Sequence, residues 1–499
     1  MNELTTEDRE QRSRLAGIIN QGDRAGTRSI LSMAVSLSLP SIMAQLANIL
    51  MQYIDATMVG HVGKDAAASI GLISTSTWLF MGLCSAAATG FAVQVAHLIG
   101  ARRNTDAAAV GRQGYIATFL FSLAIAAAGI AISPRLPYIL GGSGEVASGA
   151  SAYFLIFALS LPIMQLNFLS NNMLRCSGNM LVPGITGVLM CVFDVVFNFF
   201  LIFPTREIVL AGIPVTIPGF NLGVQGAALG TGLAMLVATL ILAAYLWHGN
   251  SELNLRRIRG HWRPTREVVR KAFTLGYPIG IERIINSSAQ ITLTMIVAPL
   301  GAAAIAANAF AVTAEGLCYM PGFGISDAAT TMTGQAIGAG KKSLARRFAY
   351  ITVIMGISVM SVMGLVMYIA APAIIGIMTP DREIVDLGVM ALRIEAWAEP
   401  MYAAAIVCYG AFIGAGDTFK PCAMNLASMW VVRITLAAIL APIMGLKGVW
   451  VAMCVELCFR GIIFLIRLRS GTWFRNSVLK SDSAQDDADT IVNDTPGLG

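Results

Sequence analysis

Long apolar segments are the feature that most constrains how this chain can fold. Twelve stretches each exceed the roughly 20 residues that a helix needs to cross a lipid bilayer. They lie near residues 36–59, 66–99, 114–133, 147–173, 181–203, 222–247, 272–299, 302–337, 348–377, 384–413, 421–443 and 446–468. They are continuous apolar runs and not short alternating segments, which favours helices over a β-barrel. The sequence therefore predicts an all-α polytopic membrane protein with twelve transmembrane helices.

The composition agrees with this class and argues against others. Hydrophobic residues make up 56% of the chain and charged residues only 12%, whereas soluble proteins carry about 25% charged residues. The net charge of +6 does not indicate nucleic-acid binding, because the basic residues fall in short segments between apolar spans. The eight cysteines lie within or beside the spans and are expected to be buried free thiols. The sequence contains no Ser/His/Asp or Cys/His constellation, so no enzyme activity is expected.

The distribution of basic residues predicts the orientation across the membrane. With the N-terminus inside, the inner segments together with Arg467 hold 25 of the 34 Lys and Arg residues, and the outer loops hold five. Both termini are therefore expected in the cytoplasm, in a multi-pass protein of the cell inner membrane. The first 27 residues are polar and charged, so no cleavable signal peptide is expected.

An internal repeat relates the two halves of the chain. At a shift of 238 residues Pro40 coincides with Pro278, and Gly100 coincides with Gly338. The last helix of each half aligns at a shift of 222, which leaves a longer outer loop at 204–221. Six helices followed by six in the same orientation predict two pseudo-symmetric six-helix bundles. Transporters built from such repeats bind substrate between or within the two lobes.

These boundaries divide the chain into five parts. A cytoplasmic N-terminal tail is expected at 1–29, an amino lobe with helices 1–6 at 30–247 and a basic cytoplasmic linker at 248–271. A carboxy lobe with helices 7–12 follows at 272–468, and a largely disordered cytoplasmic tail occupies 469–499.

Polar residues within the first apolar span form one candidate functional surface. Gln45, Asn48, Gln52 and Asp55 are spaced i, i+3, i+7 and i+10, which places them on one face of a helix. A carboxylate at bilayer depth is costly, so it is seldom without a function. Pro40 lies near the start of the same helix.

The six spans of the first half contain one further acid and neither Lys nor Arg. That acid is Asp194, and Asn198 follows it by one helical turn on the same face. An unpaired carboxylate in apolar surroundings is stabilised by a proton or a metal cation, so Asp55 and Asp194 are predicted to couple transport to an ion gradient. The alternative for each acid is a structural role, in which it only hydrogen-bonds to polar neighbours.

The spans of the second half carry both acids and bases. They are Glu282, Glu315, Asp327, Glu395, Glu399 and Glu456, with Arg283, Arg393, Arg433 and Arg460. Glu456 and Arg460 are spaced i, i+4 and are predicted to form a structural ion pair. Glu395 and Glu399 are expected to share one helix face, where an ion-pair scaffold and a cavity-lining role both stay open.

Several motifs resemble those of the multidrug and toxic compound extrusion (MATE) transporters. They are LP followed by YIDATMVGHVG in the first span, GFAVQVAHLIGARR at the end of the second, and LRCSGNMLVP between the fourth and fifth. The second half echoes them with GYP, APLGAAAIAANAF, GQAIGAGKK and FIGAGDTFKP. The resemblance covers about residues 30–470. It implies two bundles in a V around a central cleft, and export of organic, often cationic, compounds in exchange for Na⁺ or H⁺.

The resemblance also implies roles for particular residues. Asp55 matches the first-helix aspartate of the family, and Pro40 matches the proline at which that helix can bend. An amino-lobe ion site would be completed by Asp194, Asn198 and Thr231, with the Asp and Asn in the reverse of the usual order. If sodium is the coupling ion, Asp55, Asp194 and Asn198 are its expected ligands.

A second site known in other members of the family is expected to be absent. Its acidic pair on the seventh and tenth helices falls on Asn286 and Tyr402 here, although Glu282, one turn before Asn286, could substitute. Glu282 is therefore included with Gln45, Asn48 and Gln52 among the candidate cavity residues.

The sequence thus predicts a monomeric secondary active multidrug efflux antiporter in a lipid bilayer. Small-molecule drugs or toxic metabolites are the expected substrates, and H⁺ or Na⁺ is the expected coupling ion, with no other cofactor. The alternative is a flippase for lipid-linked precursors, which would favour a basic central cavity. A passive channel or a scaffold without transport is a third possibility. The sequence leaves the substrate and the choice between H⁺ and Na⁺ open.

Overall fold

The computed structural model describes residues 2–210, 213–248, 253–256 and 262–476, and nearly all of them are helical. The first half forms α1 (Asn2–Gln21), η1 (Gly22–Arg24), α2 (Thr27–Val62), α3 (Lys64–Gly100), α4 (Asn104–Ile132), α5 (Leu136–Ile139), α6 (Gly144–Cys176), α7 (Leu181–Ile202), β1 (Pro204–Leu210), β2 (Ile213–Phe220) and α8 (Gly223–His248).

The second half repeats this succession with more interruptions. It forms α9 (Arg266–Val297), η2 (Ala298–Leu300), α10 (Ala302–Gly338), α11 (Lys342–Met378), α12 (Arg382–Glu395), α13 (Glu399–Gly414), α14 (Phe419–Ala427), the π-helix η3 (Ser428–Ile434), α15 (Thr435–Met444), α16 (Leu446–Ser470) and η4 (Thr472–Asn476).

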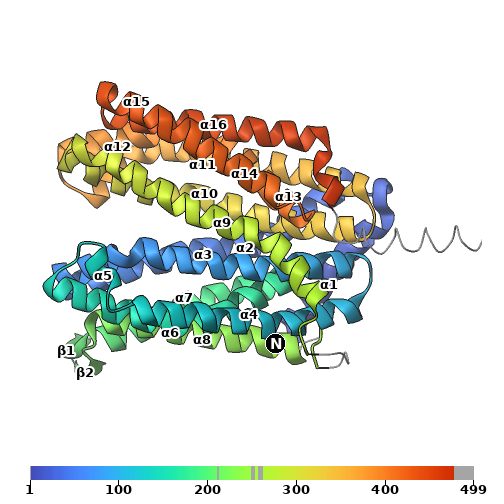
Figure 1. Cartoon of the computed structure of the whole chain (residues 1–499), viewed down its shortest axis with the longest axis horizontal. Coiled ribbons are helices and arrows are strands. Elements are labelled where there is room, and N and C mark those ends of the chain that lie inside the picture. The colour runs from blue at the N-terminus through green and yellow to red at the C-terminus, as the bar shows by residue number, and fades with distance from the viewer. Residues whose placement is uncertain (1, 211–212, 249–252, 257–261, 477–499) are drawn as a thin grey trace, which may run out of the picture.

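The long helices form two bundles that lie side by side (Figure 1). Helices α2 to α8 make the amino lobe, and α9 to α16 make the carboxy lobe. Within the described residues, ten helices are long and apolar enough to span a membrane, and the bent pair α12–α13 adds an eleventh. Helix α9 completes the set of twelve predicted spans. It has 32 residues and is long enough to cross a membrane, but its charged side chains lower its mean hydropathy. The predicted all-α fold of two six-helix bundles is confirmed.

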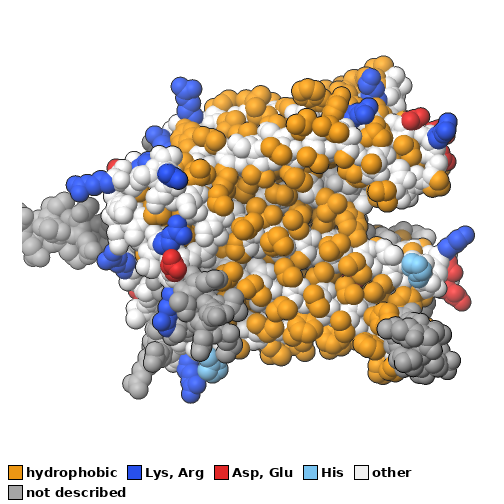
Figure 2. Space-filling model, turned by 180° about the vertical axis from the view of Figure 1, so that it is seen from behind, with side chains coloured by type: hydrophobic (Ala, Val, Ile, Leu, Met, Phe, Trp, Pro, Cys, Tyr) orange, Lys and Arg blue, Asp and Glu red, His pale blue; other side chains and the backbone are white. Residues whose placement is uncertain are grey.

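The surface shows how such a fold sits in a bilayer. Apolar side chains cover a broad belt across the middle of the face in Figure 2, while many of the Lys and Arg residues cluster at one end. We call this the basic end; α1, the start of α9 and the end of α16 all lie there (Figure 1). A notch separates the two lobes at the other end of the molecule (Figure 2).

Helix backbones of opposite lobes approach closely at several glycines. A Cβ added to Gly324 of α10 would stand 2.7 Å from the backbone nitrogen of Ile42 of α2. A Cβ added to Gly276 of α9 would stand 2.8 Å from the carbonyl oxygen of Ala86 of α3. Glycine at these positions lets the helix backbones of opposite lobes touch.

Several segments expected to be irregular have structure. The outer loop at 204–221 contains an antiparallel hairpin of β1 and β2. The expected N-terminal tail contains α1, and the last residues of the expected linker begin α9. At the C-terminal end η4 holds Trp473 fully buried. The disorder predicted for the rest of the tail, 477–499, lies outside the described residues. All eight cysteines are free thiols, as predicted.

Two features break the symmetry of the repeat in the carboxy lobe. Helices α12 and α13 meet at a bend of 58°, whereas α6, their counterpart, continues through Pro162. The eleventh span contains the seven-residue π-helix η3 between α14 and α15. Breaks and π-turns free backbone groups within a membrane span, and both are common near functional sites.

Helix α1 supplies a hydrogen bond that α2 lacks. Pro40 has no N–H, so the carbonyl of Ser36, four residues earlier, has no intrahelical partner. The Gln11 amide nitrogen donates to this carbonyl at 2.8 Å and to the Ser36 hydroxyl at 3.1 Å. Helix α2 is therefore continuous from Thr27 to Val62 in this conformation, and bending at Pro40 during transport stays a prediction.

We expect Gln11→Ala to loosen the attachment of α1. Losing a hydrogen bond of this kind costs about 1 kcal/mol, so α1 should open about fivefold more often. Hydrogen exchange of residues 9–21 in the purified protein measures this. Glu10→Ala, an exposed neighbour on the same helix, is the control and should leave the exchange rate unchanged. Equal exchange in both variants would contradict the role of Gln11.

Candidate functional site

Three of the predicted ion-coupling residues meet in the amino lobe. The Asn198 amide nitrogen on α7 donates to Asp55 Oδ1 on α2 at 2.7 Å and to Asp194 Oδ2 at 3.0 Å. Because Asp194 and Asn198 are one turn apart, both side chains project from the same side of α7. Thr231 on α8 and Asp55 both lie close enough to act on the Asp194 carboxyl group. Four residues from three helices thus form one polar cluster.

This cluster is buried and lacks a basic partner. Asp194 and Asn198 are completely buried, and Asp55 is half-buried. Across the described residues, neither carboxylate makes an ion pair with Lys, Arg or His. Two buried acceptor oxygens, Asp194 Oδ1 and Asn198 Oδ1, accept no hydrogen bond from any described group. Two carboxylates this close in apolar surroundings repel each other, and a proton or cation would relieve the repulsion.

Close packing of α7 against α8 fixes the position of Asn198. A Cβ added to Gly230 of α8 would collide with the Asn198 side chain, with its Cγ at 2.9 Å. Glycine at this position therefore leaves room for the amide. A Cβ added to Gly184 of α7 would stand 2.8 Å from the Pro40 Cβ of α2, so these two helices also pack closely nearer the basic end.

A cavity adjoins the cluster at the end of the molecule away from the basic end. Its volume is about 470 Å³, and α2 and α7 line it. The lining side chains are mostly apolar or aromatic and include Tyr53, Met58, Phe199 and Phe203. The cavity is open to the surface, and its lining residues on α2 lie within two turns of Asp55 along the helix.

The predicted polar face of α2 serves two separate sites. Gln45 lies at the inter-lobe contact, where its amide nitrogen is 3.4 Å from Asp327 Oδ2. Asn48 and Gln52, farther along α2, are exposed. Asp55 faces α7. The four side chains therefore do not contact one common partner, and the predicted cavity-lining role of Asn48 and Gln52 stays a prediction.

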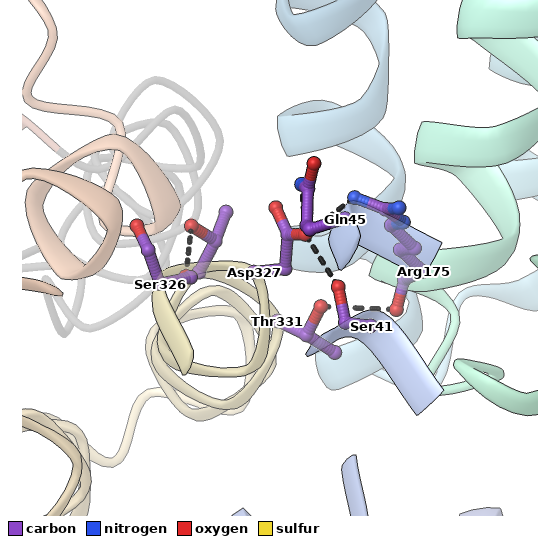
Figure 3. Close-up of polar contacts among 7 residues, drawn as sticks. Ser41, Gln45, Arg175, Ser326, Asp327 and Thr331 are labelled. Atoms are coloured by element: carbon purple, nitrogen blue, oxygen red, sulfur yellow. Dashed lines mark hydrogen bonds and ion pairs between the residues drawn. The ribbon is translucent and has the colours of Figure 1, made fainter. Parts of the chain in front are cut away.

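The second of these sites is an ionic cluster between the lobes (Figure 3). Asp327 of α10 pairs with Arg175 at the end of α6 and accepts a hydrogen bond of 2.6 Å from the Ser41 hydroxyl of α2. Thr331, one turn after Asp327, donates to the Arg175 carbonyl at 3.0 Å. Helix α6 extends to Cys176, beyond the predicted span of 147–173, so Arg175 lies in its last turn and not within that span.

Sequence reasoning overlooked Arg175 and Ser41, although the repeat contains a signal for both. At the shift of 238, Arg175 corresponds to Ile413 and Asp327 to Thr89. Where a charged residue of one half corresponds to a neutral residue in the other half, the fold does not require a charge at that position. Asp55 is distinguished in the same way, because its counterpart is Leu293.

Glu282 lies apart from the ion-coupling residues. It is buried in the carboxy lobe, where it accepts hydrogen bonds from Tyr409 at 2.6 Å and from Asn425 at 2.8 Å. Both carboxylate oxygens therefore have donors from α13 and α14. Its predicted role as a substitute for Asn286 stays a prediction.

A second group of acids lies at the break between α12 and α13. Glu395 ends α12 and Glu399 begins α13, so these residues do not share one continuous helix face as expected. Both are completely buried, and their four carboxylate oxygens have no hydrogen-bond partner in the described chain. Arg393 instead stacks over Tyr368 at 5.3 Å. The predicted pair of Glu456 with Arg460 is confirmed at 2.6 Å.

Comparisons with known proteins agree with this architecture. The sequence model of the MatE family matches residues 40–200 and again residues 278–439, together more than half of the chain. The two matches begin 238 residues apart, which is the shift of the internal repeat.

Two relatives are similar in sequence to this chain over most of their length. A probable multidrug resistance protein NorM of Thermotoga maritima is 26% identical over 459 residues, or 91% of this chain and 95% of that protein. The protein of the same description from Pseudomonas aeruginosa is 29% identical over 437 residues, or 84% of this chain and 85% of that protein.

Solved structures share the fold at lower identity. The outward-facing conformation of a multidrug resistance MATE family transporter matches with a TM-score of 0.80 and 20% identity, over 90% of this chain and 97% of that one. A MATE structure in the bent conformation matches with a TM-score of 0.79, over 92% and 98%. The two family matches and the common two-lobe fold show that the chain belongs to the MATE family of membrane transporters.

Proposed function

We propose that this transporter is a secondary active antiporter that exports organic, often cationic, compounds in exchange for H⁺ or Na⁺. It is not an enzyme, and the coupling ion is its only cofactor. The observation that carries the proposal is the buried cluster of Asp55, Asp194 and Asn198, whose carboxylates have no basic partner among the described residues. The names of the NorM relatives support multidrug substrates.

The cluster has the chemistry that exchange requires. Asp55 and Asp194 together favour a bound proton or cation, and Asn198 and Thr231 supply neutral oxygens that suit either ion. The adjoining aromatic cavity supplies apolar contact for the body of a drug, while Asp55 attracts its positive charge. Ion and drug then compete for the same carboxylate, and exchange follows when they favour different conformations.

The setting of this function follows from the distribution of charge. The basic end faces the cytoplasm by the positive-inside rule, so both termini lie inside and the notch opens outward. The protein acts in the cell inner membrane, and one chain suffices because one amino lobe contains the whole cluster.

Asp55→Asn should reduce gradient-driven drug efflux from proteoliposomes to less than about a tenth of the wild-type rate, while the protein still inserts. The amide keeps the size and the hydrogen bond but removes the charge that binds the ion. Efflux is measured under an imposed pH gradient and, separately, an imposed sodium gradient. Asp65→Asn, which removes an exposed carboxylate near the same end of the molecule, should transport normally. Full coupled efflux by Asp55→Asn would overturn the proposal.

The carboxy-lobe acids provide a second test. If the amino lobe contains the coupling site, Glu395→Gln and Glu399→Gln should retain coupling to the same ion, because the amide leaves Asp55 and Asp194 untouched. The ratio of efflux with and without the gradient measures coupling in each variant. Loss of coupling in these variants, with Asp55→Asn active, would place the site in the carboxy lobe instead.

A flippase is the alternative outcome of these experiments. It would need bases in the central cavity to hold a pyrophosphate group. Among the described bases near the lobe contact, Arg175 pairs with Asp327, and Arg283 lies against Gly82 of α3. Transfer of a fluorescent lipid pyrophosphate between leaflets, without drug efflux, would favour the flippase.

A further inference from the structure

Two hydrogen bonds between the lobes are copies of each other under the internal repeat. Nε2 of His97 on α3 lies 2.8 Å from the carbonyl oxygen of Gly414, at the end of α13. The Gln335 amide nitrogen on α10 donates to the carbonyl oxygen of Cys176, at the end of α6, at 2.9 Å. At the shift of 238 residues, His97 corresponds to Gln335 and Cys176 corresponds to Gly414. Each lobe therefore caps the same helix end of the other.

The backbones around these bonds also meet symmetrically. A Cβ on Gly100 would collide with the Gln335 backbone, and a Cβ on Gly338 would collide with the His97 backbone, with carbonyl carbons at 2.7 Å in both cases. A Cβ added to Gly334 would stand 3.0 Å from the Cβ of Ala96, which is its own counterpart in the repeat. The pseudo-twofold axis thus passes between the ends of α3 and α10, at the basic end.

The chemistry of these contacts suits an interface that can open and close. We call the two hydrogen bonds and the backbone contacts around them the seal. Cys176 and Gly414 are the last residues of their helices, where carbonyl groups lack an intrahelical partner. In the closed molecule His97 and Gln335 satisfy them, and both side chains are almost completely buried. Because a carbonyl can only accept, His97 must carry its proton on Nε2. If the lobes part, water can replace both donors, so the net change in free energy is small.

The two flanks of the seal differ. On one side are Asp327, Arg175 and Ser41, joined by the ion pair and hydrogen bond shown in Figure 3. On the symmetry-related side Ile413 and Ile279, the counterparts of Arg175 and Ser41, lie in one apolar cluster. The matched pair His97 and Gln335 is thus a polar contact that both halves of the interface share.

We propose that His97 and Gln335 are matched positioning residues that close the basic end of the transporter, and that both hydrogen bonds break and re-form in each transport cycle. Neither residue touches the predicted ion site. The proposal concerns lobe movement alone and does not depend on which ion or substrate the protein carries.

Hydrogen exchange measured by mass spectrometry on the protein in lipid nanodiscs tests this role. His97→Ala and Gln335→Ala should each increase opening of residues 92–101 and 330–339 by about fivefold. The double variant should increase it by about 25-fold if the two bonds act independently. Exchange at residues 56–70 and 293–305, at the opposite end, should not increase in any of them.

Variants that exchange the two side chains distinguish the effect of a hydrogen bond from the effect of packing alone. His97→Gln copies the residue used by the other half and should exchange like the wild type, and Gln335→His should do the same. If the alanine variants do not fold, Gly338→Ala gives a second route, since its methyl group would separate the lobes while both donors remain.

A matched control removes a similar bond within one lobe. Gln165, completely buried in the amino lobe, donates to the Cys84 carbonyl at 3.2 Å. Gln165→Ala should increase hydrogen exchange within the amino lobe without a selective increase in exchange at the basic end. The proposal is overturned if His97→Gln exchanges as fast as His97→Ala, or if the alanine variants raise exchange equally at both ends.

Discussion

Close contact between the ends of α3 and α10 is the constraint on which the arrangement of the two lobes depends. Gly100 and Gly338 let the two helix backbones touch at the pseudo-twofold axis, and a side chain on either one would force the lobes apart. With the lobes joined there, Gly276 and Gly324 continue the contact along α9 and α10. Ile49 and Tyr53 of α2 continue the contact with α10, and the lobes diverge at the notch of Figure 2. A few residues without side chains therefore set the shape of the transporter.

Comparison of corresponding residues in the two halves distinguishes residues that the fold requires from residues that only one lobe contains. The counterparts of Asp55 and Asn198 are Leu293 and Leu436; Leu293 belongs to a buried apolar cluster in the carboxy lobe, and the partly buried Leu436 packs against it. The same packing position can thus be filled by leucine, so the fold does not require a carboxylate there. Burial of two unpaired acids is costly, and the cost is understandable if these residues bind an ion. The repeat provides an internal control that a single domain lacks.

The sequence predicted much of the fold, because hydropathy and the repeat are properties of single segments and their order. It also brought Asp194 and Asn198 together, since residues one turn apart on a helix face the same way. It could not predict contacts between distant segments, such as Arg175 with Asp327 or Gln11 with Ser36. The break after Glu395 was also missed, because one apolar run of normal length covers both α12 and α13.

Helix α2 connects the predicted ion site to the closed end of the molecule. It carries Ser41 at the inter-lobe ion pair and Asp55 at the acidic cluster, about 21 Å apart along a continuous helix. Gln11 satisfies the backbone group that Pro40 leaves free, so α2 can act as one rigid rod in this conformation. A rigid rod transmits a small displacement from one end to the other, whereas a helix broken at Pro40 would absorb it. The state of α1 therefore bears on how strongly ion binding at Asp55 and lobe separation at Ser41 influence each other.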